Sequence, residues 1–163
     1  MDRPARKPNR LSQYDYSTPG AYFITICTKD KRCILGSIVG ASIARPATVA
    51  LSAMGKIVEK AILQIPVHYP AVSVDRYVVM PNHVHLLLQI HTDESGRPMV
   101  APTISRIMQQ MKGAVTKQIG RSVWQKLYHD HVIRGEDDLR AVREYIAHNP
   151  ARWREDELYS ETF

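Results

Sequence analysis

Two β-prone runs separated by only two residues are the feature that most constrains the fold of this chain. Residues 72–80 (VSVDRYVVM) and 83–90 (HVHLLLQI) are rich in β-branched and apolar residues, and the turn-forming pair Pro81-Asn82 lies between them. A connection this short returns the second strand beside the first, in the antiparallel direction. The sequence therefore predicts a tight antiparallel pair of strands.

Helical and strand patterns on either side of this pair form an ordered series. Apolar residues recur at helical spacing in three segments, and β-branched or aromatic residues gather in two others. We expect a strand at 21–28, a helix from Ser52 to Pro66, a helix at 103–119, a strand at 124–132 and a helix from Glu136 to about His148. Residues 32–51 are interrupted by glycine and proline, which indicates a hairpin or an irregular excursion.

The order of these elements is strand, helix, strand, strand, helix, strand, and then one more helix. The first six elements form the split β-α-β arrangement of ferredoxin-like folds. The sequence therefore predicts an α+β protein whose antiparallel sheet carries helices on one face and leaves the other available for ligands. The chain has 163 residues and no repeats. We expect a single domain over 1–163, in which 1–20 form a basic arm.

The charge balance favours a polyanionic partner. The chain has 22 Lys plus Arg against 16 Asp plus Glu, a net charge of +6, and such an excess attracts phosphate backbones. Arg106 and Lys112 lie on the helix expected at 103–119 and are candidate DNA contacts, although solvated helix faces carry such residues too. No apolar run approaches the roughly 20 residues of a membrane span. With no secretory signal and only Cys27 and Cys33, we expect a cytoplasmic protein with reduced thiols and no membrane partner.

His83 and His85 begin the second run of the central strand pair. Residues two apart leave the same face of a strand, so both imidazoles are expected on one face while Val84 points into the core. Their side-chain roots would lie roughly 7 Å apart, which allows them to converge on one metal ion. Taken alone, this pair is a weak indication of a metal site.

Tyr145 and Asn149 lie four residues apart on the last expected helix, in EYIAHNP, and so share one helix face. Two imidazoles and an amide oxygen, with positions left open, suit Mg²⁺ or Mn²⁺ better than structural zinc. Such an ion polarises a phosphodiester, and a neighbouring tyrosine can attack phosphorus to form a phosphotyrosine. Considered singly, Tyr145 fits a half-buried helix residue equally well, and Asn149 fits a residue that ends the helix before Pro150.

Three ordered segments resemble the single-tyrosine HUH transposases, and most of all their REP-associated tyrosine transposase branch. The segments are YVVMPNHVHLLL (77–88), WQKLYHDHVIR (124–134) and DLRAVREYIAHNPARW (138–153). The opening YDYSTPGAYFITICTKDKRCILG (14–36) is similar to the same branch. The resemblance covers nearly the whole chain, and the excursion before residue 52 is its least matched part.

The resemblance implies a metal-dependent endonuclease and strand transferase that acts on single-stranded DNA at hairpin or palindromic repeats. It assigns His83 and His85 to the metal pair, Asn149 to the third ligand and Tyr145 to the nucleophile. Attack by Tyr145 would leave a 5′-phosphotyrosine and a free 3′-hydroxyl, and the reverse attack would rejoin DNA without ATP. The acting form would be a monomer, or a homodimer that pairs one chain's histidines with the other chain's tyrosine.

Other residues near these motifs have weaker assignments. His129 and His131 form a second His-x-His pair on the strand expected at 124–132. Because the resemblance places the metal elsewhere, His131 and Arg134 become candidate DNA contacts. Tyr128 is a rival nucleophile, but it has no amide ligand one helical turn away.

Asn82 could orient a ligand or contact a DNA phosphate, and Trp124 and Trp153 could stack on unpaired bases or pack in the core. Two alternative functions stay open. The first is a domesticated, non-catalytic protein that binds single-stranded or hairpin DNA. The second is a replication initiator or relaxase with the same metal-and-tyrosine chemistry, which fits poorly with a short chain that has no P-loop.

Overall fold

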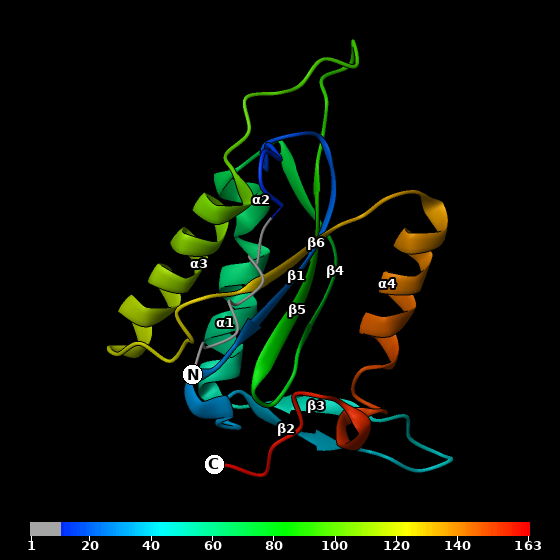
Figure 1. The fold of residues 1–163 in the computed structure, drawn as a ribbon. Helices are drawn as coiled ribbons and strands as arrows, with labels where there is room; N and C mark the ends of the chain where they lie inside the picture. The colour runs from blue at the N-terminus through cyan, green and yellow to red at the C-terminus, as the bar shows by residue number, and fades with distance from the viewer. Residues whose placement is uncertain (1–10) are drawn as a thin grey trace, which may run out of the picture.

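The computed structural model describes residues 11–163, so the first ten residues of the expected basic arm lie outside the described residues. Its centre is an antiparallel sheet with the strand order β4-β5-β1-β6 (Figure 1). The strands are β1 (Gly20–Cys27), β4 (Val72–Val79), β5 (His83–Ile90) and β6 (His129–Val132). The predicted pair of adjacent antiparallel strands is β4 and β5, and β5 lies between β4 and β1.

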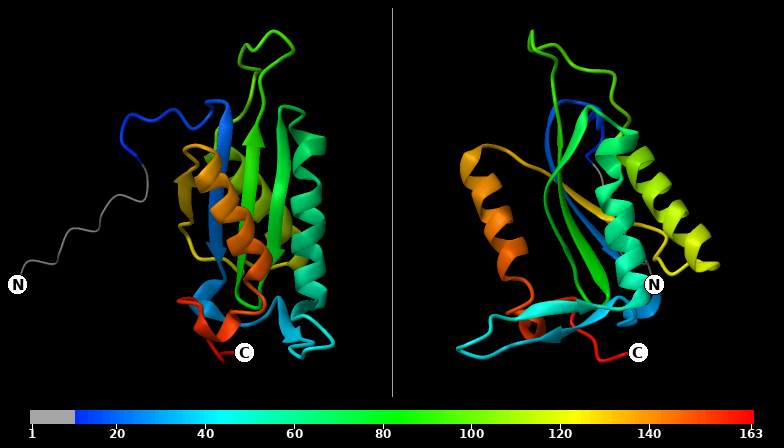
Figure 2. Two further views of the ribbon diagram at one scale, coloured as in Figure 1. Left: turned by 90° about the vertical axis from the view of Figure 1, so that its right-hand side faces the viewer. Right: turned by 180° about the vertical axis from the view of Figure 1, so that it is seen from behind.

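Helices lie on both faces of this sheet. One face is covered by α1 (Ala53–Leu63), α2 (Ile65–His68) and α3 (Ile104–Ile119), and the other by α4 (Glu136–His148) (Figures 1 and 2). Along the chain, α1 lies between β1 and β4, and α3 lies between β5 and β6. The predicted ferredoxin-like arrangement is therefore confirmed. The face expected to stay open is partly occupied by α4. Within residues 11–163, no helix is long and apolar enough to cross a membrane.

The pleat of β5 divides its side chains between the two faces of the sheet. Val84, Leu86 and Leu88 belong to the large core beneath α1 and α3. The residues between them face α4, where Leu87 packs against α4. Because β5 is hydrogen-bonded on both edges and covered on both faces, nearly its whole run HVHLLLQI is buried.

Two contacts hold α4 against the sheet. Val142 and Ile146 form an apolar cluster with Leu87 of β5. In addition, the Arg143 guanidinium donates two hydrogen bonds to the Asp75 carboxylate, at 2.9 and 2.6 Å. Asp75 lies in β4 at the point where the pairing with β5 shifts register. The Arg143 side chain of α4 therefore binds to β4 at this irregularity.

Three boundaries differ from the sequence expectation or refine it. The excursion at 32–51 contains a separate hairpin of β2 (Gly36–Val39) and β3 (Thr48–Leu51). Of the strand expected at 124–132, only residues 129–132 form a strand, which is β6. Trp124 makes no more than an isolated bridge to Thr28. The carbonyls of Gln125 and Lys126 accept hydrogen bonds from Lys112 Nζ and not from a neighbouring strand. Pro66 does not follow the first helix but lies in the first turn of α2, where proline is tolerated.

Residues 11–19 form irregular turns that pack on the sheet. The Tyr16 ring lies in the core and meets the Tyr14 ring edge-on at 5.0 Å. The Tyr22 ring is packed next to both. The described part of the expected arm is therefore anchored by aromatic contacts.

Gly55 allows the start of α1 to lie close to Leu35, which supports the turn between β4 and β5. Leu35 N donates to Pro81 O at 2.9 Å, and Leu35 O accepts from Ser52 N at 2.9 Å. The Ser52 side chain accepts from Gly55 N, which makes Ser52 the helix N-cap as expected. A Cβ on Gly55 would lie 2.0 Å from Leu35 O, a backbone atom that cannot rotate away.

We predict that Gly55→Ala destabilises the protein although alanine favours helices. The clash with Leu35 should lower the free energy of unfolding by about 1–3 kcal/mol, the range for overpacked sites. Gly113→Ala in α3 is the matched control, because nothing lies within 4 Å of its Cβ position, and it should stabilise the protein by up to about 1 kcal/mol. Urea unfolding measures both changes, and equal effects of the two substitutions would contradict the packing argument.

Candidate functional site

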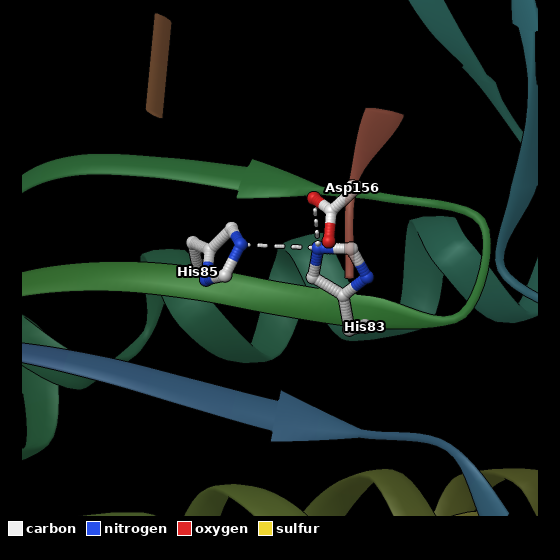
Figure 3. Close-up of side chains that lie close together, drawn as sticks. All are labelled: His83, His85 and Asp156. Atoms are coloured by element: carbon white, nitrogen blue, oxygen red, sulfur yellow. Dashed lines mark hydrogen bonds and ion pairs between the residues drawn. The ribbon is translucent and has the colours of Figure 1, made fainter. Parts of the chain in front are cut away.

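His83 and His85 lie side by side on the face of the sheet that α4 covers. In the register with β1, His83 is opposite Cys27 and His85 is opposite Thr25. Their Nε2 atoms are 3.1 Å apart, and the side chains are 0% and 2% exposed (Figure 3). Val84 points to the opposite side, into the core. The structure therefore brings the two imidazoles together as the strand spacing predicts.

Asn82 fixes the orientation and the tautomer of His83. Its Nδ2 donates to the carbonyls of Lys31 (3.2 Å) and Leu158 (2.8 Å), which turns its Oδ1 toward His83 Nδ1 at 2.8 Å. An amide oxygen can only accept, so His83 Nδ1 carries a proton and the neutral ring presents the Nε2 lone pair to the site.

Thr25 has the corresponding place beside His85. Its Oγ1 lies 2.8 Å from His85 Nδ1, and a hydroxyl can accept from that nitrogen when Nε2 binds an ion. Each imidazole thus has a hydrogen-bond partner on its outer nitrogen, which is the usual support of a metal-binding histidine.

Tyr145 and Asn149 reach the histidines from α4 and its C-cap. The Tyr145 ring centroid is 5.2 Å from that of His85 and 6.0 Å from that of Phe23, and the side chain is 47% exposed. Asn149 is only 3% exposed, and its Oδ1 has no hydrogen-bond partner within residues 11–163. The structure therefore places all four residues in one region, with the tyrosine on the solvent side and the amide inside.

Asp156 belongs to the same cluster, although the sequence did not single it out. It follows the short 3-10 helix η2 (Trp153–Glu155), and its Oδ2 lies 3.8 Å from His83 Nε2 (Figure 3). Asn149 Nδ2 donates to the same oxygen at 2.9 Å. Donor atoms of Asp156 and the two histidines all lie within 4.8 Å of one another.

Burial sets the protonation of the site. It lowers the pKa of His83 to about 4, although the Asp156 carboxylate acts in the opposite direction. The pKa of His85 lies well below its ordinary value, because of burial first and the neighbouring His83 second. For Tyr145, burial and the charges of Asp156 and Glu157 raise the pKa of the phenol. At neutral pH the imidazoles are therefore uncharged and the phenol is protonated.

The donors fit a divalent cation of the magnesium or manganese type. Neighbouring ligands of an octahedral ion with bonds of about 2.1 Å lie about 3 Å apart, and the two Nε2 atoms are 3.1 Å apart. Two imidazole nitrogens, an amide oxygen and a carboxylate suit Mn²⁺ or Mg²⁺. A cation would also satisfy the buried Asn149 Oδ1, since an unpaired polar atom in the interior is costly.

Among the candidate DNA contacts, Asn82 has a different place from the one expected. It is 1% exposed, and its side chain is engaged by His83 and two carbonyls of the described chain. In this arrangement the Asn82 side chain is turned toward His83 and away from the surface.

His131 lies in β6, an edge strand of the sheet, and Arg134 follows that strand. His131 is paired with Phe23 of β1, so its side chain is on the face of the sheet that α4 covers. The His131 side chain is 53% exposed, and its Nε2 lies 2.9 Å from Asp138 Oδ2. Arg134 N donates to the same carboxylate, and the residue is exposed. Both residues stay candidate DNA contacts.

Arg106 and Lys112 are on α3, across the sheet from the histidines. Arg106 is exposed, but Lys112 Nζ donates to Gln125 O at 2.7 Å, and burial lowers its pKa. Lys112 therefore supports the segment before β6. The structure does not bring this pair together with the four site residues.

Tyr128, the rival nucleophile, and Trp124 pack in or against the core, whereas Trp153 lies by the site. Tyr128 packs against the core beneath α3, and its Oη lies 3.3 Å from Ser105 Oγ, away from the histidines. Trp124 belongs to the same core. Trp153 instead lies by the site, with its ring centroid 5.9 Å from that of His83.

Comparisons with known proteins agree with this fold. The family described as "Transposase IS200 like" matches residues 48–149. An uncharacterized protein of Haemophilus influenzae is 33% identical over 94% of this chain and 93% of its own length. A second protein of that organism, named for the REP-associated tyrosine transposases, is 25% identical over 52% of each chain.

A solved structure is similar as well. It is a REP-associated tyrosine transposase bound to a REP hairpin, with a TM-score of 0.65, 22% identity, and coverage of 88% of this chain and 73% of that one. At this identity the similarity establishes the shared fold. The residues matched by the family include β4, β5, α4 and all four candidate site residues. The chain therefore belongs to the IS200-like transposase family.

Proposed function

We propose that this chain cuts and rejoins single-stranded DNA at hairpin or palindromic repeats through a phosphotyrosine intermediate on Tyr145. His83, His85 and Asn149 would hold the divalent cation, Mg²⁺ or Mn²⁺, on which the reaction depends. The observation that carries the proposal is that α4 brings a solvent-accessible tyrosine and a buried, unpartnered amide oxygen to two neutral imidazoles.

The reaction is a transesterification. Tyr145 Oη attacks phosphorus, the bond from phosphorus to the 3′ oxygen breaks, and that oxygen takes up a proton. Because its pKa is raised, Tyr145 is a phenol in the resting state and releases its proton as the new bond forms. When bound, the cation polarises the phosphodiester and offsets the charge that develops on its oxygens. Attack of a 3′-hydroxyl on the phosphotyrosine then reverses the step and joins DNA without ATP.

The surroundings of Tyr145 support a substrate that needs a cation. Tyr145 and Asn149 line an open cavity of about 710 Å³, in which acidic side chains outnumber the one arginine: its charged lining residues are Glu144, Arg152, Glu155, Asp156 and Glu157. A phosphate that enters this cavity meets like charge, so a divalent ion next to the tyrosine would favour its approach. The net charge of +6 favours DNA binding by the molecule as a whole.

The choice of hairpin DNA rests on the similar structure, which is bound to a REP hairpin. One chain supplies all four residues of the proposed centre, because β5 carries the two histidines, α4 carries Tyr145, and Asn149 is the C-cap of α4. We therefore propose that a monomer suffices for cutting. A homodimer that exchanges α4 would need the Asp75–Arg143 contact to open or to form between chains.

We predict that Tyr145→Phe abolishes a covalent DNA adduct. The protein is incubated with Mn²⁺ and a set of labelled single-stranded hairpin oligonucleotides, and the products are separated on a denaturing gel. The native protein should form an adduct, whereas the variant lacks the only oxygen proposed to attack phosphorus. Tyr128→Phe is the matched control and should retain the adduct.

Two outcomes of this experiment would change the conclusion. An adduct in Tyr145→Phe would show that another residue is the nucleophile. Hairpin binding by the native protein without any adduct would favour the alternative function, a non-catalytic protein that binds hairpin DNA.

We further predict that the metal-free protein loses stability as the pH falls from about 6.5 to 4. In this window the unfolded chain protonates His83 whereas the folded chain keeps it neutral, so acid favours unfolding. A shift from 6.5 to about 4 corresponds to a loss on the order of 3 kcal/mol. Urea unfolding in the presence of a chelator, at a series of pH values, measures this loss. His83→Gln should reduce this loss and leave the part that comes from His85, whose pKa burial also lowers, and an unchanged slope in that variant would contradict the assignment.

A further inference from the structure

We infer that Asp156 is a fourth ligand of the metal ion, so that the segment following α4 completes the metal site. This inference rests on the proposed function, because it concerns the same ion. It adds a charged oxygen donor to a site in which the two histidines and Asn149 supply only neutral donors.

The Asp156 carboxylate lies close to both histidines. Asp156 Oδ2 lies 3.8 Å from His83 Nε2, and it is within 4.8 Å of a donor nitrogen of each histidine (Figure 3). Within residues 11–163, this is the one group of three such side chains with donor atoms so close together. A single ion can therefore contact all three after small adjustments.

Among residues 11–163, the Asp156 carboxylate is buried without a positively charged neighbour. The Asp156 side chain is 3% exposed, and the one basic side chain within 4.0 Å of it in the described chain is His83. The tautomer set by Asn82 turns a lone pair of His83, not an N–H, toward the carboxylate. A buried carboxylate next to a nitrogen lone pair lacks the positive partner that such groups normally have, and a metal ion between the two provides it.

The Asn149 amide is oriented by Asp156. Its Nδ2 donates to Asp156 Oδ2 at 2.9 Å, which leaves its Oδ1 buried without a partner. The carboxylate therefore fixes which side of the amide is available to an ion. This unpartnered oxygen is independent of the histidine spacing and also points to a cation.

The segment that carries Asp156 is held by a residue that also orients the histidine pair. Leu158 N donates to Asp156 Oδ1 at 2.8 Å, and Leu158 O accepts from Asn82 Nδ2 at 2.8 Å. Asn82 Oδ1 in turn accepts from His83. The Trp153 ring, one turn before Asp156, lies over His83. Ligands from β5 and from the C-terminal segment are thus positioned by one connected set of hydrogen bonds.

Titration with Mn²⁺ tests the inference, with the unbound ion followed by its electron paramagnetic resonance signal. Asp156→Asn keeps an oxygen that can accept from Asn149 but removes the charge, and we expect it to weaken Mn²⁺ binding at least about tenfold, as loss of metal-site partners does. Glu157→Gln removes the same charge from a neighbouring residue of the same cavity. This control should bind Mn²⁺ within about twofold of the native protein.

The outcomes separate this inference from the function on which it rests. If Asp156→Asn binds Mn²⁺ as tightly as Glu157→Gln while His83→Ala has lost binding, Asp156 is not a ligand and the proposed histidine site stands. If His83→Ala binds Mn²⁺ like the native protein, the proposed histidine site itself is wrong. If Asp156→Asn does not fold, Asp156→Glu retains a carboxylate and should bind Mn²⁺ within about tenfold of the native protein, and loss of binding there would contradict ligation.

A Co²⁺ spectrum distinguishes a ligand from a residue that only positions the segment. The visible absorption bands of Co²⁺ depend on its coordinated atoms, so Asp156→Asn should shift them and Glu157→Gln should not. If the Asp156→Asn protein has the native Co²⁺ spectrum, the carboxylate does not touch the metal and the inference is overturned.

Discussion

The packing of α4 on β5 is the contact on which the candidate site depends. Val142 and Ile146 bury their side chains against Leu87, and the Arg143–Asp75 pair fixes the helix to β4. This arrangement leaves Tyr145 on the solvent side and turns the C-cap residue of α4 toward the imidazoles. Without it, the two imidazoles of β5 would have neither the Tyr145 phenol nor the Asn149 amide beside them. These few contacts between α4 and the sheet therefore decide whether Tyr145 and Asn149 lie next to the two histidines.

Much of this arrangement could be predicted because it follows from local periodicity. Alternation along β5 places His83 and His85 on one face, and helical spacing places Tyr145 and Asn149 on one face of α4, whatever the rest of the chain does. The short connection between β4 and β5 fixes their antiparallel pairing, and element order then favours the ferredoxin-like topology. The structure agrees with these expectations since none of them requires knowledge of distant contacts.

Other features depend on contacts that sequence patterns do not contain. Glu155, Asp156 and Glu157 are three consecutive acids, and only the turn after η2 decides that the middle one is buried beside His83. Asn82 similarly occurs in a motif typical of turns, and its role emerges only from the two carbonyls that orient its amide. The shortening of β6 has the same origin, because a lysine on α3 takes the carbonyls that precede it.

The pleat of β5 has a consequence for how such a protein can change over time. The side chains that pack beneath α1 and α3 alternate with those that serve the site, so an exchange of one aliphatic residue for another at Leu86 or Leu88 alters volume on the far side of the backbone. The donor atoms of His83 and His85 keep their direction as long as the strand stays paired on both edges. Aliphatic exchanges on the core face can therefore accumulate without turning the two imidazoles away from α4 on the other face.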